Sequence, residues 1–423
     1  MTTAVTSRPA RSSFRWVICG LLFFATVIAY VDRGVLAYLE KTLEGIIGFN
    51  SRQYSYMTSA FSAAYAIGLV TAGRWTDRLG TRKGFAIAMV LWSVAAMSPG
   101  MVKSPVAFGV AMFFLGLGEA ANFPACIKTV AEWFPKAQRA LATGYFNSGA
   151  NIGAIIVPMV VPFMALALGW RGAFIGCGAL GFVWLAAWLL LYNQPEAHKR
   201  VSPEELAFIT SDPPERIETV PWLRIIPMRE TWAFALGKFF SDPPWWFYLF
   251  WLPRFLQETF HLNMAQNRLP VITVYVISTV GSVAGGELSG LMMRTGRSLN
   301  FARKTTLLIC ALAVLPVLYA PYSQHLWVVV ALLGLAMAAH QGWSANLFTL
   351  TSDMFPKTAV ASVVGFGGML GAVGNFMFQL CAGYVVDLTH SYLPLFLFCG
   401  LAYLLALALV HLLAPRLAPA KLD

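Results

Sequence analysis

Long apolar stretches alternate with short polar segments along the whole chain of 423 residues. A helix needs about 20 predominantly apolar residues to cross the hydrocarbon core of a bilayer. Twelve stretches approach or exceed that length, at about 14–36, 54–74, 84–102, 104–127, 138–162, 170–192, 231–255, 268–292, 304–321, 325–348, 358–382 and 391–413. This pattern predicts an all-α membrane protein with twelve transmembrane helices.

One long polar connection divides the predicted helices into two sets of six. It spans 193–230 and is punctuated by Pro195, Pro203, Pro213 and Pro214, as is typical of a linker between domains. We therefore expect an N-terminal half at 1–192, a cytoplasmic linker at 193–230 and a C-terminal half at 231–423.

The two predicted halves share short sequence repeats. Glu132-Trp-Phe-Pro-Lys136 and Asp353-Met-Phe-Pro-Lys357 are offset by 221 residues, and a weaker similarity links 73–83 with 290–304. Such repeats indicate duplicated, pseudo-symmetric halves around a central cavity, the architecture of many secondary transporters.

The charges agree with a membrane protein and predict its orientation. Only 12% of the residues are charged and 58% are hydrophobic, against about a quarter charged in soluble domains. With both termini inside, the inner segments carry 21 Lys and Arg and the outer loops carry 6. The positive-inside rule then predicts a multi-pass protein of the bacterial inner membrane with cytoplasmic termini.

Several other classes of protein are disfavoured by the composition. The net charge of +11 comes from residues that flank apolar helices, so we expect the lipid bilayer as the surroundings and no nucleic acid as a partner. The six cysteines lie in apolar segments without a CxxC pair, so no metal and no cofactor is expected.

An enzyme would need clustered nucleophiles, metal ligands or a phosphate loop, and a sensor would need an output domain after the last helix. We expect neither class. We also do not expect the first span to be a signal peptide, because Tyr30, Asp32 and Arg33 interrupt its end and no convincing small-residue cleavage site follows.

The loop after the second predicted helix carries a family resemblance. It reads Gly73-x-x-x-Asp77-Arg78-x-Gly80-x-Arg82-Lys83, which resembles the signature loop of the major facilitator superfamily. The resemblance implies the major facilitator fold and a gating role for Gly73, Asp77, Arg78, Gly80 and Arg82. Such a loop latches the halves and does not touch substrate.

Finer motifs resemble the anion:cation symporter branch of that family, and within it the hexuronate transporters. They are Tyr30-Val-Asp32-Arg33, Gly118-Glu119-Ala120-Ala-Asn122-Phe-Pro124, Gly144-Tyr145-Phe-Asn147-Ser148-Gly149, Gln194-Pro195-Glu196 with Ser202-x-x-Glu205, Lys238-Phe-Phe-Ser-Asp242-Pro243, and His340-Gln341-Gly-Trp343-Ser344. The resemblance implies import of a small organic anion, a hexuronate such as glucuronate or galacturonate, together with a proton. We expect the protein to be a monomer. One departure concerns the fourth helix, where 111–115 contains no arginine, although many members carry one there.

Ionised residues inside predicted spans are the main functional candidates, because an ionised group at mid-bilayer costs roughly 2.5–3.5 kcal/mol. Arg33 offers a permanent charge and a fork that fits a carboxylate, so it is the first candidate for anion binding. Asp32 and Glu119 are candidates for proton coupling, with Glu119 the leading carrier. Each can also be structural: Arg33 in a pair with a neighbouring helix, and Glu119 as a permanently protonated hydrogen-bond donor.

Charged and titratable residues also fall in the second half. Lys238 and Asp242 are four residues apart, and we expect Pro243-Pro244 to break the helix after them. An internal ion pair and a contact with substrate are equally compatible with this spacing. His340 occupies the repeat position of Glu119, and both a proton role and a hydrogen-bonding role remain open.

Uncharged polar and aromatic residues complete the predicted binding site. The remaining substrate-binding candidates are Tyr30, Tyr65, Asn147, Asn151, Gln341, Trp343, Ser344, Asn375 and Gln379. Their amides and hydroxyls suit a hydroxyl-rich cargo, but they could equally join helices to one another. Aromatic residues on the seventh helix keep an aromatic acid open beside galactonate and glucarate as alternative cargoes.

Overall fold

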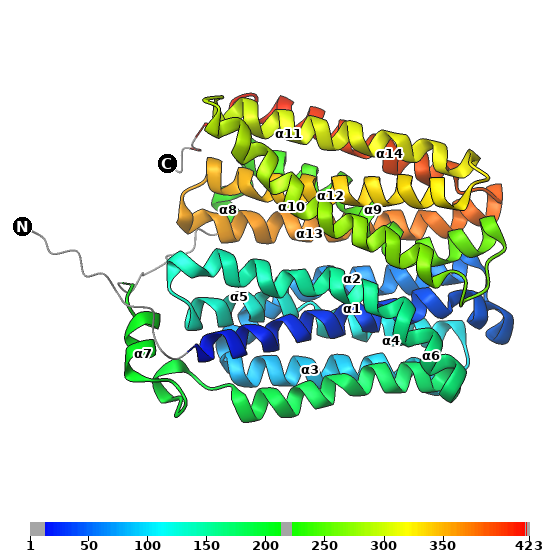
Figure 1. Cartoon of the computed structure of the whole chain (residues 1–423), viewed down its shortest axis with the longest axis horizontal. Helices are drawn as coiled ribbons and strands as arrows, with labels where there is room; N and C mark the ends of the chain where they lie inside the picture. The colour runs from blue at the N-terminus through cyan, green and yellow to red at the C-terminus, as the bar shows by residue number, and fades with distance from the viewer. Residues whose placement is uncertain (1–12, 213–221, 419, 421–423) are drawn as a thin grey trace, which may run out of the picture.

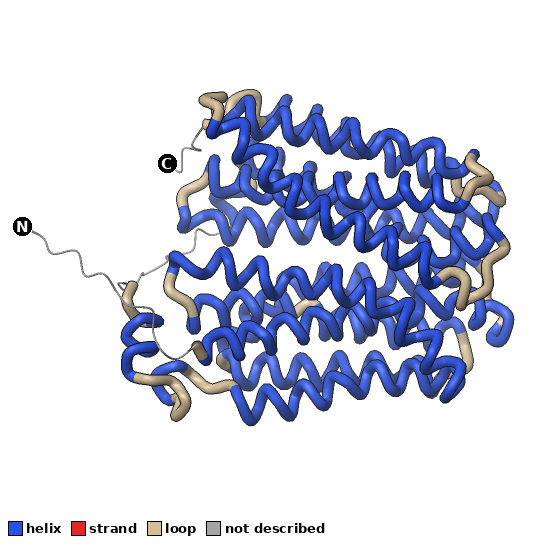
Figure 2. Tube along the Cα trace, viewed as in Figure 1, coloured by secondary structure: helices blue, strands red, loops and turns tan. Residues whose placement is uncertain are grey.

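The computed structural model describes residues 13–212, 222–418 and 420. These residues form helices joined by loops, and none of them lies in a strand (Figure 2). The predicted all-helical fold is confirmed.

Most of the helices belong to two consecutive groups. The first group contains α1 (Phe14–Ile47), α2 (Ser51–Leu79), α3 (Thr81–Met97), the 3₁₀ turn η1 (Ser98–Met101), α4 (Pro105–Glu119), α5 (Asn122–Trp133) and α6 (Lys136–Leu191). The second group contains α9 (Arg229–Phe260), α10 (Arg268–Arg294), α11 (Leu299–Val314), η3 (Leu315–Tyr322), α12 (Leu326–Met354), α13 (Lys357–Thr389) and α14 (Leu393–Leu413). Between them lie η2 (Pro195–Ala197), α7 (Pro203–Ile209) and α8 (Trp222–Ile225).

The number of spans agrees with the twelve predicted from the sequence. Eight helical segments of the described chain are long and apolar enough to cross a membrane, and one of them, 141–191, contains two spans. Gly169, with φ of +72°, separates these two spans within α6. The helices α2, α9 and α10 complete the set, and α4 and α5 count together as one span.

Figure 1 shows the two groups as two bundles side by side, with α1–α6 in one and α9–α14 in the other. They meet where α2 packs on α13, α1 on α9, and α6 on α10. We call the end of the molecule where α1 begins and α14 ends the terminal end, and the opposite end the distal end. Because the connections are short, successive spans run in opposite directions between these two ends.

Two helix boundaries differ from the sequence prediction. The first helix was expected to end near residue 36, but α1 continues to Ile47, where Gly48 caps it in the left-handed region. Its additional turns contain Glu40, Lys41 and Glu44, whose charges form ion pairs at the distal end. Pairing with the other half therefore extends the helix beyond its apolar stretch.

Proline breaks a different helix from the one expected. The prediction that Pro243-Pro244 end their helix is wrong, because α9 remains helical through both prolines. The fourth span is instead interrupted between Glu119 and Asn122. Pro124 has no N–H to donate to the carbonyl four residues earlier, which weakens the ladder at that point.

The repeated loops have the same backbone geometry in both halves. Pro135 has φ and ψ of −63° and 153°, and Pro356, its equivalent, has −64° and 153°. Gly80 and Gly296 both take positive φ at the other pair of related turns, where a side chain would be strained. The sequence repeat therefore corresponds to a structural repeat.

The segment between the halves is anchored to the first half by one carboxylate. Ser202 caps α7, and Glu205 on α7 accepts hydrogen bonds from the backbone N–H groups of Phe14 and Arg15. Glu205 also pairs with the Arg15 guanidinium at 3.0 Å. A carboxylate at the N-terminus of α1 satisfies its free N–H groups and its dipole.

Candidate functional site

The centre of the first half contains a buried ion pair. Arg33 of α1 donates a hydrogen bond from Nε to Oε2 of Glu119, the last residue of α4. Their side chains are 4% and 0% exposed. The second oxygen of Glu119, Oε1, has no hydrogen-bond partner among the described residues.

Small residues beside Glu119 bring neighbouring helices close to it. Gly116 lies against the backbone of Phe61 on α2. A Cβ on Gly118 would lie 2.7 Å from the Cβ of Trp92 on α3, so only glycine fits without a shift. These contacts exclude water from the carboxylate and surround it with protein.

Four aromatic rings enclose the Arg33 guanidinium, and we call them the Arg33 cage. The guanidinium carbon lies 4.8 Å from the ring centre of Tyr30, 5.2 Å from Phe61, 5.1 Å from Tyr65 and 5.0 Å from Trp246. Rings at this distance attract a cation through their negative faces. Trp246 belongs to α9, so the cage joins the two halves.

Asp32 lies on another face of α1 from Arg33. Its Oδ2 accepts a hydrogen bond of 3.1 Å from the indole N–H of Trp92, and its Oδ1 has no partner among the described residues. The buried Asp32 side chain therefore faces α3, inside the first half.

The charged candidates of the second half are held within that half. Lys238 Nζ lies 2.8 Å from Asp242 Oδ1 and 4.6 Å from the ring centre of Phe348. His340 hydrogen-bonds the hydroxyl of Tyr403 at 2.7 Å and stacks on Trp245, with ring centres 5.2 Å apart.

Four predicted amides form hydrogen bonds between the halves. Gln341 donates to Asn151 at 3.2 Å, which joins α12 to α6. Asn375 of α13 donates to Ser62 of α2 at 2.8 Å. The buried Gln379 accepts hydrogen bonds from Trp251 at 2.9 Å and from Thr58, a residue of α2, at 3.3 Å.

Three further candidates lie apart from the cage. Asn147 is exposed on α6. Trp343 is fully buried against Tyr403 inside the second half, with its indole N–H unpaired among the described residues. Ser344 beside it is half-buried.

The predicted gating loop is only partly described. Arg78 is exposed in the last turn of α2, Gly80 forms the turn, and Arg82 donates to the carbonyl of Leu189 at 2.7 Å. The structure describes neither the surroundings of Gly73 nor the side chain of Asp77.

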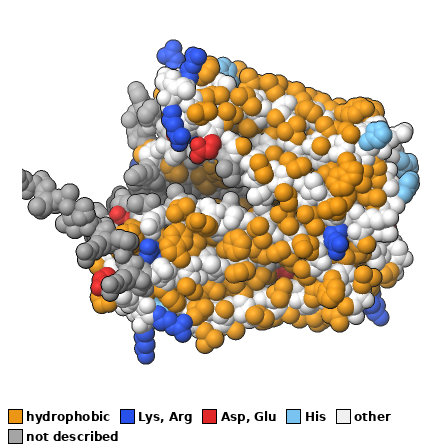
Figure 3. All heavy atoms as spheres, viewed as in Figure 1, with side chains coloured by type: hydrophobic (Ala, Val, Ile, Leu, Met, Phe, Trp, Pro, Cys, Tyr) orange, Lys and Arg blue, Asp and Glu red, His pale blue; other side chains and the backbone are white. Residues whose placement is uncertain are grey.

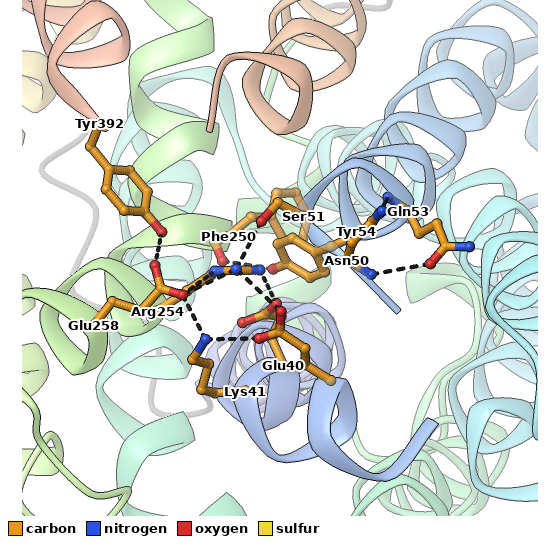
Figure 4. A network of polar contacts seen from close by, with 11 residues as sticks. Glu40, Lys41, Asn50, Ser51, Gln53, Tyr54, Phe250, Arg254, Glu258 and Tyr392 are labelled. Carbon is orange, nitrogen blue, oxygen red and sulfur yellow. Dashed lines mark hydrogen bonds and ion pairs between the residues drawn. The ribbon is translucent and has the colours of Figure 1, made fainter. Parts of the chain in front are cut away.

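A charge network at the distal end was not predicted from the sequence. Arg254 of α9 contacts Glu40 of α1 through Nη1 and Ser51 of α2 at 2.8 Å through Nη2 (Figure 4). Lys41 bridges the halves through Glu258 at 2.6 Å, and Glu258 also accepts from Tyr392 at 2.6 Å. We call these residues, together with Glu44, the distal network.

The sequence contained a partial signal for the distal network. Arg254 and Glu258 are four residues apart, a spacing at which opposite charges on one helix can form an ion pair. Their partner Glu40 lay beyond the expected end of the first helix, so the network could not be recognised.

The hydrogen bonds and ion pairs described here between α1–α6 and α9–α14 lie from the middle of the bundle to the distal end. Towards the terminal end the surface is hollowed between the two halves (Figure 3). The arrangement is that of a protein closed at the distal end and open at the other.

Comparison with known proteins places the chain in a family. Residues 22–379 match the family model described as Major Facilitator Superfamily. The hexuronate transporter of Escherichia coli (strain K12) is 32% identical over 388 residues, which cover 90% of each chain. The galacturonate transporter of Dickeya chrysanthemi is 31% identical over 71% of this chain and 89% of its own, and a probable galactarate/D-glucarate transporter of E. coli (strain K12) is 28% identical over 93% of each.

A solved structure has the same fold at low sequence identity. It is a bacterial homolog of the human lysosomal transporter Spinster in an inward-facing and occupied conformation, with a TM-score of 0.73, 14% identity and coverage of 96% of both chains. The family match, the twelve spans and the paired halves agree. This chain is a multi-pass membrane protein of the major facilitator superfamily, a transporter and not an enzyme.

Proposed function

We propose that this chain imports a sugar-acid anion, a hexuronate, together with a proton. The observation that carries the proposal is the Arg33–Glu119 pair inside the Arg33 cage, at the contact between the halves. Relatives named for hexuronate, galacturonate and galactarate or glucarate support an organic acid as the cargo.

The ion pair suggests how anion and proton are coupled. While Glu119 is ionised, it neutralises Arg33 and competes with any incoming carboxylate. A proton on Glu119 removes that competitor, and the guanidinium, which offers five N–H donors, can then bind the substrate carboxylate. Proton and anion thus favour each other's binding, and Asp32 is the second candidate for the proton.

The surroundings of Arg33 suit the rest of a sugar acid. The cage rings can cover the apolar faces of a sugar, while Asn151 and Gln341 offer amides whose present bond could be exchanged for bonds to hydroxyls. The terminal end corresponds to the cytoplasm by the charge distribution, so the described state faces inward. We place the protein, as a monomer, in the bacterial inner membrane.

Coupling is needed because an anion entering a negative interior climbs about 2.3 kcal/mol per charge per 100 mV. We expect purified protein in liposomes to accumulate glucuronate or galacturonate when the outside is acidic. Glu119→Gln mimics the protonated carboxyl and cannot release its proton. The variant should therefore lose accumulation driven by a pH gradient but keep exchange between loaded compartments.

The assay also separates the alternatives. A Glu119→Gln protein that still accumulates substrate would make Glu119 structural and shift the proton to Asp32. A wild type that ignores the pH gradient would exclude proton coupling. Competition by galactonate, glucarate and an aromatic acid in the same assay identifies the cargo class.

A further inference from the structure

A row of side chains on α9 leads from the Arg33 cage towards the terminal end. Trp246 closes the cage, and Asp242 and Lys238 precede it by four and eight residues. Residues four apart lie above one another on a helix, so the three share one face. At 1.5 Å per residue, Asp242 lies about 6 Å and Lys238 about 12 Å from Trp246 along the axis.

This spacing matches the length of the proposed substrate. A six-carbon acid has five carbon–carbon bonds of about 1.5 Å, so its ends lie about 6 Å apart when it is extended. If one carboxylate binds Arg33, the other end of the molecule reaches the level of Asp242, whose carboxylate holds the ammonium of Lys238 at 2.8 Å. The inference below therefore rests on the proposed function, because it assumes a six-carbon acid whose carboxylate binds Arg33.

The charge of Lys238 is already matched by Asp242. Their charged atoms are 2.8 Å apart, and the side chains are 10% and 15% exposed. Gly371 of α13 lies directly against the Asp242 carboxylate, which limits its freedom to turn away. A substrate therefore meets a neutral pair here, whereas a second carboxylate, poorly hydrated inside the protein, would need a cation of its own.

We propose that Asp242 sets the preference of the site for the number of carboxylates in its substrate. By neutralising Lys238, it makes the site select sugar acids with one carboxylate over those with two. The relatives divide along the same chemical line, since hexuronates and galacturonate carry one carboxylate and galactarate and glucarate carry two. Asp242 is thus a specificity-determining residue rather than a proton carrier.

Glucuronate and glucarate provide the test, because their open-chain forms differ only in having an aldehyde or a carboxylate at one end. Each unlabelled acid is used to inhibit uptake of labelled glucuronate by cells or liposomes. The ratio of the two inhibition constants is then compared between wild type and the variants. Wild type should prefer glucuronate. Asp242→Asn keeps the shape, removes the negative charge and frees Lys238, so the ratio should shift about tenfold or more towards glucarate.

Two further variants identify the cause of such a shift. The double variant Lys238→Gln/Asp242→Asn has no charge at the pair and should lose the gain for glucarate. Asp242→Glu keeps the charge and should keep the preference of wild type. Glu287→Gln is a matched control, because Glu287 pairs with Arg294 at 3.7 Å on an exposed surface, with 69% of its side chain exposed, and the ratio should not change.

The ratio of the affinities for glucuronate and glucarate can also be measured without transport, from the thermal stabilisation of the purified variants by each acid. This measurement applies even to a variant that binds substrate but does not transport it. An unchanged ratio in Asp242→Asn, with wild type transporting glucuronate, overturns this inference and leaves the proposed function intact. A wild type that accepts glucarate as well as glucuronate also overturns it. A wild type that binds neither acid removes the proposed function and the inference together.

Discussion

Arg33 is held by two interactions that differ in geometry. The hydrogen bond to Glu119 uses only Nε, whereas the cage rings surround the delocalised charge. In the proposed function, the bond to Glu119 is exchanged for a bond to substrate while the cage remains. A residue can in this way be a structural partner in one state and a ligand-binding group in another, so the two interpretations of Arg33 are compatible.

Arg33→Lys should weaken substrate binding about tenfold to a hundredfold although the charge is kept. A lysine ammonium is a point charge and cannot bind a carboxylate through two parallel hydrogen bonds. Charge-assisted hydrogen bonds contribute about 1.5–3 kcal/mol, which corresponds to this range. The dependence of uptake on substrate concentration measures the change.

Arg52→Lys is the control for this substitution. Arg52 pairs with Asp387 at 3.5 Å at the distal end, with 39% of its side chain exposed, so uptake should hardly change. Near-normal affinity in Arg33→Lys would move the carboxylate site away from Arg33 and make Lys238 the next candidate.

At the scale of helices, apolar length and repeats were sufficient to predict the fold, and contacts between distant residues explain what was missed. The first helix was predicted to end near Leu36, but α1 continues through Glu40, whose charge is neutralised by Arg254, 214 residues away. In the same way, Arg33 and Glu119 were each identified from their charge inside a span. Their pairing, across 86 residues, depends on helix rotation and depth that composition does not determine.

The close packing of Gly118 gives a prediction at the scale of helices. Gly118→Ala would place a methyl group against Trp92, so α3 and α4 must separate. Overpacking of this kind costs about 1–3 kcal/mol. We expect a lower melting temperature in detergent and weaker transport, because Trp92 also orients Asp32.

Gly109→Ala on the same helix is the matched control. A Cβ at Gly109 meets nothing within 4 Å, and alanine favours helix over glycine. This variant should be as stable as wild type or slightly more stable. Equal melting temperatures for the two variants would contradict the tight packing between α3 and α4.

At the scale of the whole molecule, the two halves are joined by contacts of different kinds at different depths. Amide hydrogen bonds and the Arg33 cage join them near the middle, and the distal network joins them at the distal end. Opening the distal end separates Arg254 from Glu40 and gives up this ion pair. We therefore expect the distal network to act as a latch whose strength sets the balance between a closed and an open distal end.

Arg254→Gln should shift this balance towards a state that is open at the distal end. Breaking a buried pair by removing one partner costs about 3–5 kcal/mol, and here only the closed state bears that cost. Ser55 reports the change, because it is fully buried and bonded to the backbone of α13. With Ser55→Cys in a background without the six native cysteines, an impermeant maleimide added at the distal side should react on the order of a hundredfold faster, because about 1.4 kcal/mol corresponds to a factor of ten.

A second substitution separates loss of the latch from general damage. Glu40→Gln added to Arg254→Gln removes the unpaired carboxylate, so the labelling rate should fall back towards that of the parent protein. Arg52→Gln, at an exposed pair of the same end, should leave the rate unchanged. If Arg254→Gln labels no faster than the parent, the distal network does not hold the halves together, and the contacts near the middle, the amides and the Arg33 cage, must do so.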